Sequence, residues 1–208
     1  MTIEQIIQER QISEILHFTT SDGLTGILHE RQVKARAFLK DDETLAFILK
    51  LNTQKNYDPD WKQFVNLSIS RINHSLFGYS KHWHPDARWR ILAFDPVILT
   101  HNGVHFVTTN NAYWQHLVRG TGALALARLF DPEVKGIYDN RIGRTEHMPT
   151  FWTTDVQAEV LYPKAVPTTF LRTIYVRTPA EADSVAGKIA TLQHADVSIV
   201  VCPEKFVK

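Results

Sequence analysis

Apolar and polar residues alternate most clearly in the segment FVNLSIS (64–70). Successive side chains of an extended strand point to opposite sides, so its aliphatic residues share one face while Asn66 and Ser68 share the other. The pattern predicts a strand that buries one face in the core and keeps the other face polar. A polar face of this kind either contacts solvent or forms part of a site.

A second segment, WTTDVQAEVLY (152–162), places a Gln and a Glu two residues apart within an apolar run. If Val156–Tyr162 is extended, Gln157 and Glu159 lie side by side on one face, directly after a Thr-Thr-Asp turn. The solvated face of an edge strand is the simplest explanation of such a pair. The alternative is a pair of functional side chains, and it depends on what the rest of the chain provides.

Shorter patterns predict the remaining elements. Apolar runs bounded by turn residues predict strands at ILHFT (15–19), WRILAFDP (89–96), VHFVTTN (104–110), FLRTIYVRT (170–178) and SIVVCP (198–203). Helical spacing predicts helices within residues 3–16, 20–33, 112–131 and 179–194. We expect Ser21 or Asp22 to cap the second helix, and Pro179 to begin the last one.

The order of these elements predicts the fold class. Strands dominate the middle and end of the chain, with helices at the front and between them, which is typical of an α+β fold. Segment 33–60 is expected to be a helical or loop excursion, and residues 131–149 a polar loop. No repeat or linker divides the sequence, so we expect a single domain over residues 1–208.

Composition narrows the class of protein. The 208 residues are 44% apolar with a formal net charge of +1, as in a globular protein with a sizeable core. The small net charge argues against coating nucleic acid through bulk electrostatics, but it leaves room for a local basic groove. The single cysteine, Cys202, excludes an internal disulfide. Without a signal-peptide pattern or a membrane-spanning apolar stretch, we expect a cytoplasmic protein with no membrane partner.

Three polar clusters fall on predicted strands, and their order is informative. The first strand carries His17 and Thr19, the second carries the polar face of Asn66 and Ser68, and a later one carries the Gln-x-Glu pair. This order resembles the layout of ADP-ribosyltransferases, in which NAD lies in a cleft between two small sheets. The resemblance implies an ADP-ribosyltransferase-like split β-sandwich with an NAD cleft.

Longer segments are more closely similar to the DarT family of DNA ADP-ribosyltransferase toxins. They are LHFTTSDGLTGILHERQV (16–33), the strand leading into SRINHSLFGYS (70–80), and TDVQAEVLYPKAVP (154–167) followed by LRTIYV (171–176). Together they cover nearly the whole chain in order. Where the family usually reads more like Val-Pro-Phe-Tyr-Phe, this chain has FVNLSIS, which resembles the guanine-modifying branch rather than the thymidine-modifying branch.

The resemblance implies roles for the clustered residues. Glu159 would hold the nicotinamide ribose and stabilise the positive charge that develops as the bond to nicotinamide breaks. NAD would be held by residues of the first two strands: His17, Phe18, Thr19, Asn66 and Ser68. His17 would lie at the adenosine ribose and Ser68 at the nicotinamide end, unless they are simply a core histidine and a solvated serine. Gln157, whose amide both donates and accepts, is placed to contact the acceptor base.

Basic residues are candidates for two further roles. In the thymidine-modifying branch an arginine between the first two strands is a catalytic partner, and the resemblance makes Arg36 and Arg71 the candidates here, with Arg71 assigned as catalytic. The planar donor fork of Arg71 also suits a pyrophosphate or a DNA backbone. The candidates for DNA backbone contacts are equally well explained as solvated charges: Lys81, Arg88, Arg90, Arg119, Arg141 and Arg144.

Two other patterns carry less weight. His82, His84, His101 and His105 are of the right type to bind zinc, but no carboxylate or cysteine pattern completes a site, so we expect no metal. We expect His82 and His84 to share one face of a strand. The Gly-x-Gly of residues 120–122 lacks the strand and third glycine of a dinucleotide-binding fingerprint, so NAD is not expected to bind in a Rossmann manner.

The resemblance predicts an NAD-dependent mono-ADP-ribosyltransferase that modifies a base of single-stranded DNA, with guanine favoured and thymine as the alternative. A single strand fits this chemistry because a duplex hides the base edge. The family implies a toxin whose cognate antitoxin, of NADAR or macrodomain type, removes the ADP-ribose. The other hypotheses are an ADP-ribosyltransferase acting on protein or RNA, an NAD glycohydrolase, and a non-catalytic nucleic-acid-binding module.

Overall fold

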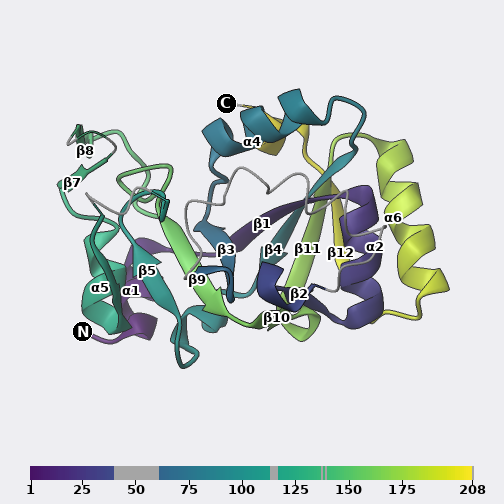
Figure 1. Ribbon diagram of the computed structural model, residues 1–208, viewed down its shortest axis with the longest axis horizontal. Coiled ribbons are helices and arrows are strands. Elements are labelled where there is room, and N and C mark those ends of the chain that lie inside the picture. Colours follow the sequence, from purple (N-terminus) through teal and green to yellow (C-terminus); the bar gives the residue numbers. More distant parts are fainter. Residues whose placement is uncertain (40–60, 113–116, 137, 139, 208) are drawn as a thin grey trace.

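One eight-stranded mixed sheet forms the centre of the fold (Figure 1). The computed structural model describes residues 1–39, 61–112, 117–136, 138 and 140–207. The strand order is β12-β11-β4-β1-β3-β9-β5-β6, in which β11 and β12 pair in parallel and the other neighbours pair antiparallel. The strands are β1 (Ile15–Thr20), β3 (Phe64–Ile69), β4 (Trp89–Phe94), β5 (His105–Val107), β6 (Arg119–Thr121), β9 (Glu159–Pro163), β11 (Leu171–Val176) and β12 (Ser198–Val201).

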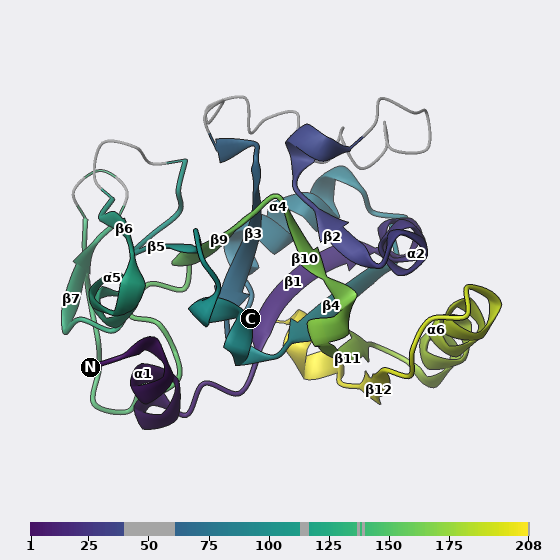
Figure 2. The same cartoon turned by 90° about the horizontal axis from the view of Figure 1, so that it is seen from below.

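Five described helices pack against this sheet, four of them in two contacting pairs. The described helices are α1 (Ile3–Arg10), α2 (Ser21–Glu30), α4 (His74–Trp83), α5 (Gly122–Arg128) and α6 (Pro179–Thr191). α1 and α5 contact each other near β5, while α2 and α6 contact each other at the opposite end of the sheet (Figure 1, Figure 2). Two small antiparallel pairs complete the fold: β2 (Gln32–Lys34) with β10 (Ala165–Pro167), and β7 (Glu133–Lys135) with β8 (Arg141–Gly143).

The two faces of the sheet have separate cores. Leu92 of β4 belongs to the larger cluster, which also takes in buried residues of α1, α2, α5 and α6. Its neighbour Ile91 belongs to the smaller cluster, with Leu16 of β1, Phe77 of α4 and Phe206 near the C-terminus. Because adjacent residues of a strand point to opposite faces, α4 covers one face and the four other helices cover the other. This arrangement buries β4 along its full length.

The sheet divides between β1 and β3. β1 pairs with β4 over all six of its residues, but it pairs with β3 only through Ile15 with Ile69 and Leu16 with Ser68. The ladder between β1 and β3 therefore ends after two residues, and a cleft lies between the remaining parts of the two strands. The predicted split between two sheets thus takes the form of one sheet whose two halves are joined at a short seam.

Much of the predicted architecture is confirmed. The fold is α+β, and β3, β4, β5, β11 and β12 lie within the predicted strand segments, while β1 extends the predicted segment 15–19 by one residue. The burial of β3 alternates along its length, with the polar residues on the less buried side. α6 begins at Pro179, and the side chain of Thr178 before it accepts a hydrogen bond from the backbone nitrogen of Glu181. Within the described residues, no helix combines the length and apolar character required to cross a bilayer.

Three local predictions are wrong. The cap of α2 is Thr20, whose hydroxyl oxygen accepts from the backbone nitrogen of Gly23 at 3.1 Å, rather than Ser21 or Asp22. The segment 112–131 contains β6 before α5, because Gly122 with φ of 77° separates an extended backbone from the helix.

The predicted polar loop at 131–149 contains the β7–β8 pair. Of the predicted excursion at 33–60, residues 40–60 lie outside the described part of the chain. The rest contributes the end of β2 and a 3₁₀ turn at Arg36–Phe38.

A buried ion pair joins β4 to α6. The side chain of Arg90 is fully buried, and its Nη1 lies 3.0 Å from Oε1 of Glu181. The same nitrogen donates to the carbonyl of Trp89 at 2.7 Å, and the other carboxylate oxygen of Glu181 accepts from the backbone nitrogen of Arg177. Burial lowers the pKa of the Arg90 guanidinium, and Glu181 opposes that shift. The prediction that Arg90 contacts DNA is wrong, because its guanidinium does not reach the surface.

We expect Glu181→Ala to lower the free energy of unfolding by about 3–5 kcal/mol, because it leaves the buried Arg90 guanidinium without its carboxylate. The matched control is Glu133→Ala, which removes an exposed pair with Arg141 and is expected to cost less than about 1 kcal/mol. Urea unfolding of both variants measures the difference. Equal and small losses would show that the buried pair does not hold α6 on the sheet.

Candidate active site

A cleft of about 210 Å³ lies where β1 and β3 part. Its walls include residues of both strands and of α4, the end of β2 with part of the segment that follows (Lys34, Ala35, Arg36 and Leu39), and Asn111 and Glu159. Five of the residues predicted to bind NAD line it: His17, Phe18, Thr19, Asn66 and Ser68. The structure therefore brings the first two predicted polar clusters and the predicted carboxylate together around one cavity.

Glu159 is the first residue of β9, where it pairs with Val107 of β5. Its side chain is largely buried, with the residue 4% exposed, but it lines the cleft. Oε2 of Glu159 accepts two hydrogen bonds, from Nδ2 of Asn66 at 2.9 Å and from the backbone nitrogen of Asn111 at 3.1 Å. One donor on β3 and one in the segment after β5 therefore fix the direction of this carboxylate.

The residues of β1 are oriented by different contacts. Nδ1 of His17 lies 3.1 Å from the backbone oxygen of Asn66, and because a carbonyl only accepts, this nitrogen carries the proton. The hydrogen bond spans the gap where the β1–β3 ladder has ended. Phe18 makes edge-on ring contacts with Phe77 of α4 and with Trp89. Phe18 therefore both lines the cleft and packs against the smaller core.

The predicted strand geometry of the Gln-x-Glu pair is wrong in one respect. β9 begins at Glu159, and residues 155–157 form a turn, so Gln157 does not share a strand face with Glu159. The turn is favoured because the Asp155 carboxylate accepts a hydrogen bond from the backbone nitrogen of Gln157 at 2.8 Å. Aspartate commonly forms such an Asx-turn with the residue two positions after it. Gln157 is partly buried in this turn, outside the cleft lining.

A buried polar cluster beside Glu159 was not predicted from the sequence. Asp155 is 2% exposed and accepts from the hydroxyl of Thr109 at 2.6 Å, while its backbone oxygen accepts from Thr153. Asn110 and Asn111, which follow β5, are also buried. The signal was the run TTNN after the apolar VHFV, because four consecutive polar residues after a core strand require partners.

The two candidate arginines lie in different places. Arg36 lines the cleft, whereas Arg71 does not appear in its lining. Nη2 of Arg71 donates to the carbonyl of Thr153 at 2.8 Å, and its guanidinium lies 4.5 Å from the ring centre of Trp152. Burial lowers the pKa of Arg71, the Asp155 carboxylate opposes that shift, and Arg144 adds to it. Arg71 therefore stabilises the segment before β9 through its contacts with Trp152 and Thr153.

The predicted DNA contacts are also separated by the structure. Lys81 is on α4, with its Nζ 4.9 Å from the ring centre of Phe77. Arg144 donates to the carbonyls of Pro149 and Trp152 at 2.6 and 2.5 Å, so it holds the backbone of the 149–152 segment. Arg141 forms its exposed pair on the β7–β8 hairpin. Of these three side chains, that of Arg141 is exposed, while Lys81 and Arg144 are partly buried.

The histidines are dispersed among unrelated contacts. His82 belongs to α4 and His84 caps its C-terminus, so the expectation that they share a strand face is wrong. Nδ1 of His101 is 2.7 Å from the hydroxyl of Tyr162, and Nδ1 of His105 is 2.9 Å from the carbonyl of Gly103. Among the residues that the structure describes, no group of three or more potential metal-binding side chains is found.

Comparison with known proteins gives a consistent result. A family model described as "ssDNA thymidine ADP-ribosyltransferase, DarT" matches residues 16–207. The solved structure of Thermus sp. 2.9 DarT in complex with NAD+ matches with a TM-score of 0.67 at 16% identity, covering 94% of this chain and 98% of that chain. The same Thermus protein in complex with ADP-ribosylated ssDNA matches with a TM-score of 0.62 at 14% identity, covering 94% and 97%.

A third match is Thermosipho africanus DarTG in complex with ADP-ribose, with a TM-score of 0.59 at 14% identity. It covers 93% of this chain but 51% of that one, so the present chain spans about half its length. No curated protein matches the chain. At these identities the solved structures establish the fold, and the family model covers every residue that lines the cleft. The chain therefore belongs to the DarT family of single-stranded DNA ADP-ribosyltransferases.

Proposed function

We propose that this chain transfers ADP-ribose from NAD to guanine in single-stranded DNA, with Glu159 as the carboxylate that acts on the nicotinamide ribose. The observation that carries the proposal is a buried carboxylate, held by two neutral donors, at the wall of a cleft lined by two strands. A group that is desolvated and fixed in direction interacts strongly with charge that develops in a transition state.

The reaction makes clear what the carboxylate supplies. The bond between the anomeric carbon and the nicotinamide nitrogen breaks, and the bonding pair leaves with nicotinamide, which becomes neutral. The ribose then carries positive charge, which Glu159 stabilises while it accepts a hydrogen bond from a ribose hydroxyl. The acceptor atom of the base forms the new bond to the anomeric carbon, and one proton is released.

The remaining cleft residues are assigned to binding. His17 contacts the adenosine ribose, and Thr19 contributes hydrogen bonds to the nucleotide. Ser68 lies on the same face of β3 as Asn66 and serves the nicotinamide end. The fit of the cleft to a dinucleotide is supported by polar side chains on both of its long walls. Arg36 adds positive charge to the wall, which suits a pyrophosphate.

The acceptor side of the site lies toward the turn before β9. Gln157 is in that turn, two residues from Glu159, and we assign its side chain to the acceptor base. Arg71 supports the turn and supplies positive charge there, which favours the approach of a DNA strand. Lys81 on α4 is assigned to the DNA backbone.

The choice of guanine rests on the sequence of β3. The segment FVNLSIS resembles the guanine-modifying branch, whereas the description of the matching family model names thymidine. Thymine is therefore the alternative acceptor. We further propose that the protein acts as a toxin and that its cognate antitoxin, of NADAR or macrodomain type, removes the ADP-ribose.

Incubation with NAD and single-stranded oligonucleotides, followed by mass spectrometry, tests the reaction. We expect the parent protein to add one ADP-ribose to DNA, and Glu159→Gln to lower the rate at least about 100-fold because it removes the charge but keeps a carbonyl acceptor for Asn66 and Asn111. Thermal unfolding provides the control that the variant is folded. Release of ADP-ribose without DNA modification would indicate a glycohydrolase, and full activity of folded Glu159→Gln would exclude the mechanism.

A second prediction concerns the NAD end of the cleft. We expect His17→Ala to weaken NAD binding measured by calorimetry about tenfold, because a good hydrogen bond in a buried site contributes about 1.4 kcal/mol. DNA binding by the same variant should change by less than twofold. An NAD affinity equal to that of the parent would remove His17 from the binding site and assign it a structural role, such as its bond to Asn66.

A third prediction concerns acceptor selection. Gln157→Ala should reduce transfer to DNA about tenfold or more, since a bidentate amide contact with a base edge is worth about 1–3 kcal/mol. Slow hydrolysis of NAD by water should be nearly unchanged, because it needs no base. The two rates are compared on oligonucleotides that differ in one base, guanine or thymine. A parallel fall of both rates would place Gln157 in the NAD site, and transfer to thymine alone would replace guanine as the acceptor.

A further inference from the structure

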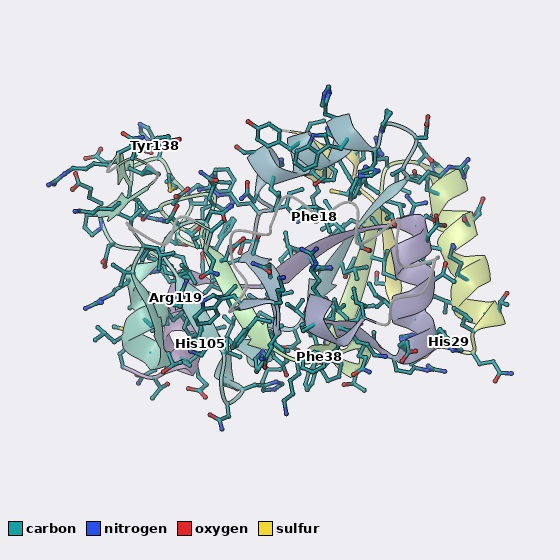
Figure 3. All side chains as sticks on the ribbon, in the orientation of Figure 1. Phe18, His29, Phe38, His105, Arg119 and Tyr138 are labelled. Carbon is teal, nitrogen blue, oxygen red and sulfur yellow. The ribbon has the colours of Figure 1, made fainter. Side chains whose placement is uncertain are left out.

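Arg119 of β6 is linked to the carboxylate of Glu159 through Asn111. Its Nε donates to Oδ1 of Asn111 at 2.8 Å, and its Nη2 donates to the same oxygen. The guanidinium also lies over the ring of Trp61, with its central carbon 3.9 Å from the ring centre. Arg119 is labelled in Figure 3, on the side of the molecule that carries β5 and β6. Its position is therefore set by a two-donor fork and by a flat aromatic surface.

Asn111 connects this arginine to Glu159. The residue is 3% exposed and follows β5 at the wall of the cleft. Its side-chain oxygen accepts from Arg119, while its backbone nitrogen donates to Oε2 of Glu159 at 3.1 Å. An anchored side chain restrains the peptide unit of its own residue, so the direction of this N–H depends on the contact with Arg119. The three residues form a continuous chain of hydrogen bonds that ends on the carboxylate.

We propose that Arg119 is a positioning residue for catalysis, which holds Asn111 so that its backbone N–H orients the carboxylate of Glu159. The inference rests on the proposed role of Glu159 and adds to it a residue that contacts neither NAD nor DNA in the reaction. Orientation matters because a displacement of about 1 Å at a reacting group can reduce a rate by about 100-fold.

The chemistry of arginine fits this role better than that of lysine. A guanidinium is planar, presents several donors in a fixed geometry and stacks on an aromatic face, whereas an ammonium is a rotating point charge. Arg119 shows both features, because two of its nitrogens donate to Asn111 and its planar guanidinium stacks on the ring of Trp61. The sequence-based alternative is that Arg119 binds the DNA backbone, for which either side chain would serve.

Arg119→Lys separates these two roles, because it keeps the charge and removes the fork. We expect turnover of NAD hydrolysis without DNA and turnover of transfer to DNA to fall together, by about tenfold to 100-fold. NAD affinity measured by calorimetry and the Michaelis constant for DNA should change by less than twofold. Arg141→Lys, on the exposed β7–β8 hairpin, is the matched control and should leave both rates unchanged.

Asn111→Ala provides an independent measurement, because it removes the anchor for Arg119 but keeps the backbone N–H. We expect it to lower both rates as Arg119→Lys does, and the double variant to be no slower than the slower single variant, since the two residues act in one chain.

Three outcomes would overturn the inference. NAD hydrolysis could stay at the parent rate in Arg119→Lys, the effects of the two single variants could add in the double variant, or Arg119→Lys could act through the Michaelis constant for DNA and a reduced salt dependence. The last result would assign Arg119 to the DNA backbone. Glu159→Gln distinguishes these outcomes from failure of the proposed function, because its loss of activity does not depend on Arg119.

Discussion

β1 and β3 pair at only two positions, Ile15 with Ile69 and Leu16 with Ser68, and the location of the site depends on where this pairing stops. Backbone groups beyond the last pair must find other partners or face solvent. The carbonyl of Asn66 is satisfied by the imidazole of His17 in place of a backbone N–H. The end of the β1–β3 pairing therefore opens the cleft and leaves room for polar side chains such as His17 on its walls. The two paired positions hold the two halves of the sheet together.

Burial of the Glu159 carboxylate is unfavourable, and hydrogen bonds from its neighbours lower that cost. Desolvation of an ionised group is unfavourable unless hydrogen bonds replace water. Asn66 and Asn111 donate such bonds, one from a side chain and one from the backbone. Both of these donors are uncharged, and both approach the same carboxylate oxygen, Oε2. Fixed dipoles of this kind need little reorganisation during a reaction, which is the basis of their catalytic effect.

The sequence was sufficient for the parts of the fold that local patterns determine. The alternation of FVNLSIS reports a strand between a core and a cleft, and Thr178-Pro179 reports a helix start, because both depend on near neighbours along the chain. The same logic failed at Gln157, where the Asp155 side chain turns the backbone before the strand begins. Local patterns also gave a wrong prediction for Arg90, because its partner Glu181 is distant in the sequence and no neighbouring residue indicates the pairing.

The candidate site shows the same difference between residues that local sequence patterns indicate and residues that long-range contacts bring together. Glu159 and the residues of β1 and β3 were predicted from a family resemblance, whereas the contacts of Asn111 and Arg119 join residues 48 and eight positions apart. No periodicity encodes a backbone N–H that points at a carboxylate. Such partners follow only when β5, β6 and β9 are placed side by side, which is a property of the sheet order and not of any segment.

The turn before β9 links the two halves of the proposed reaction. Asp155 accepts from Thr109 and Gln157, and Arg71 holds the carbonyl of Thr153, so residues 153–157 are fixed to the end of β5 and to the segment after β3. A turn held by buried hydrogen bonds resists rearrangement more than a solvated loop does. Because Glu159 follows this turn directly, the direction of the carboxylate and the place of Gln157 are set by one rigid structure. The acceptor base must then adapt to the protein, which favours a flexible single strand over a duplex.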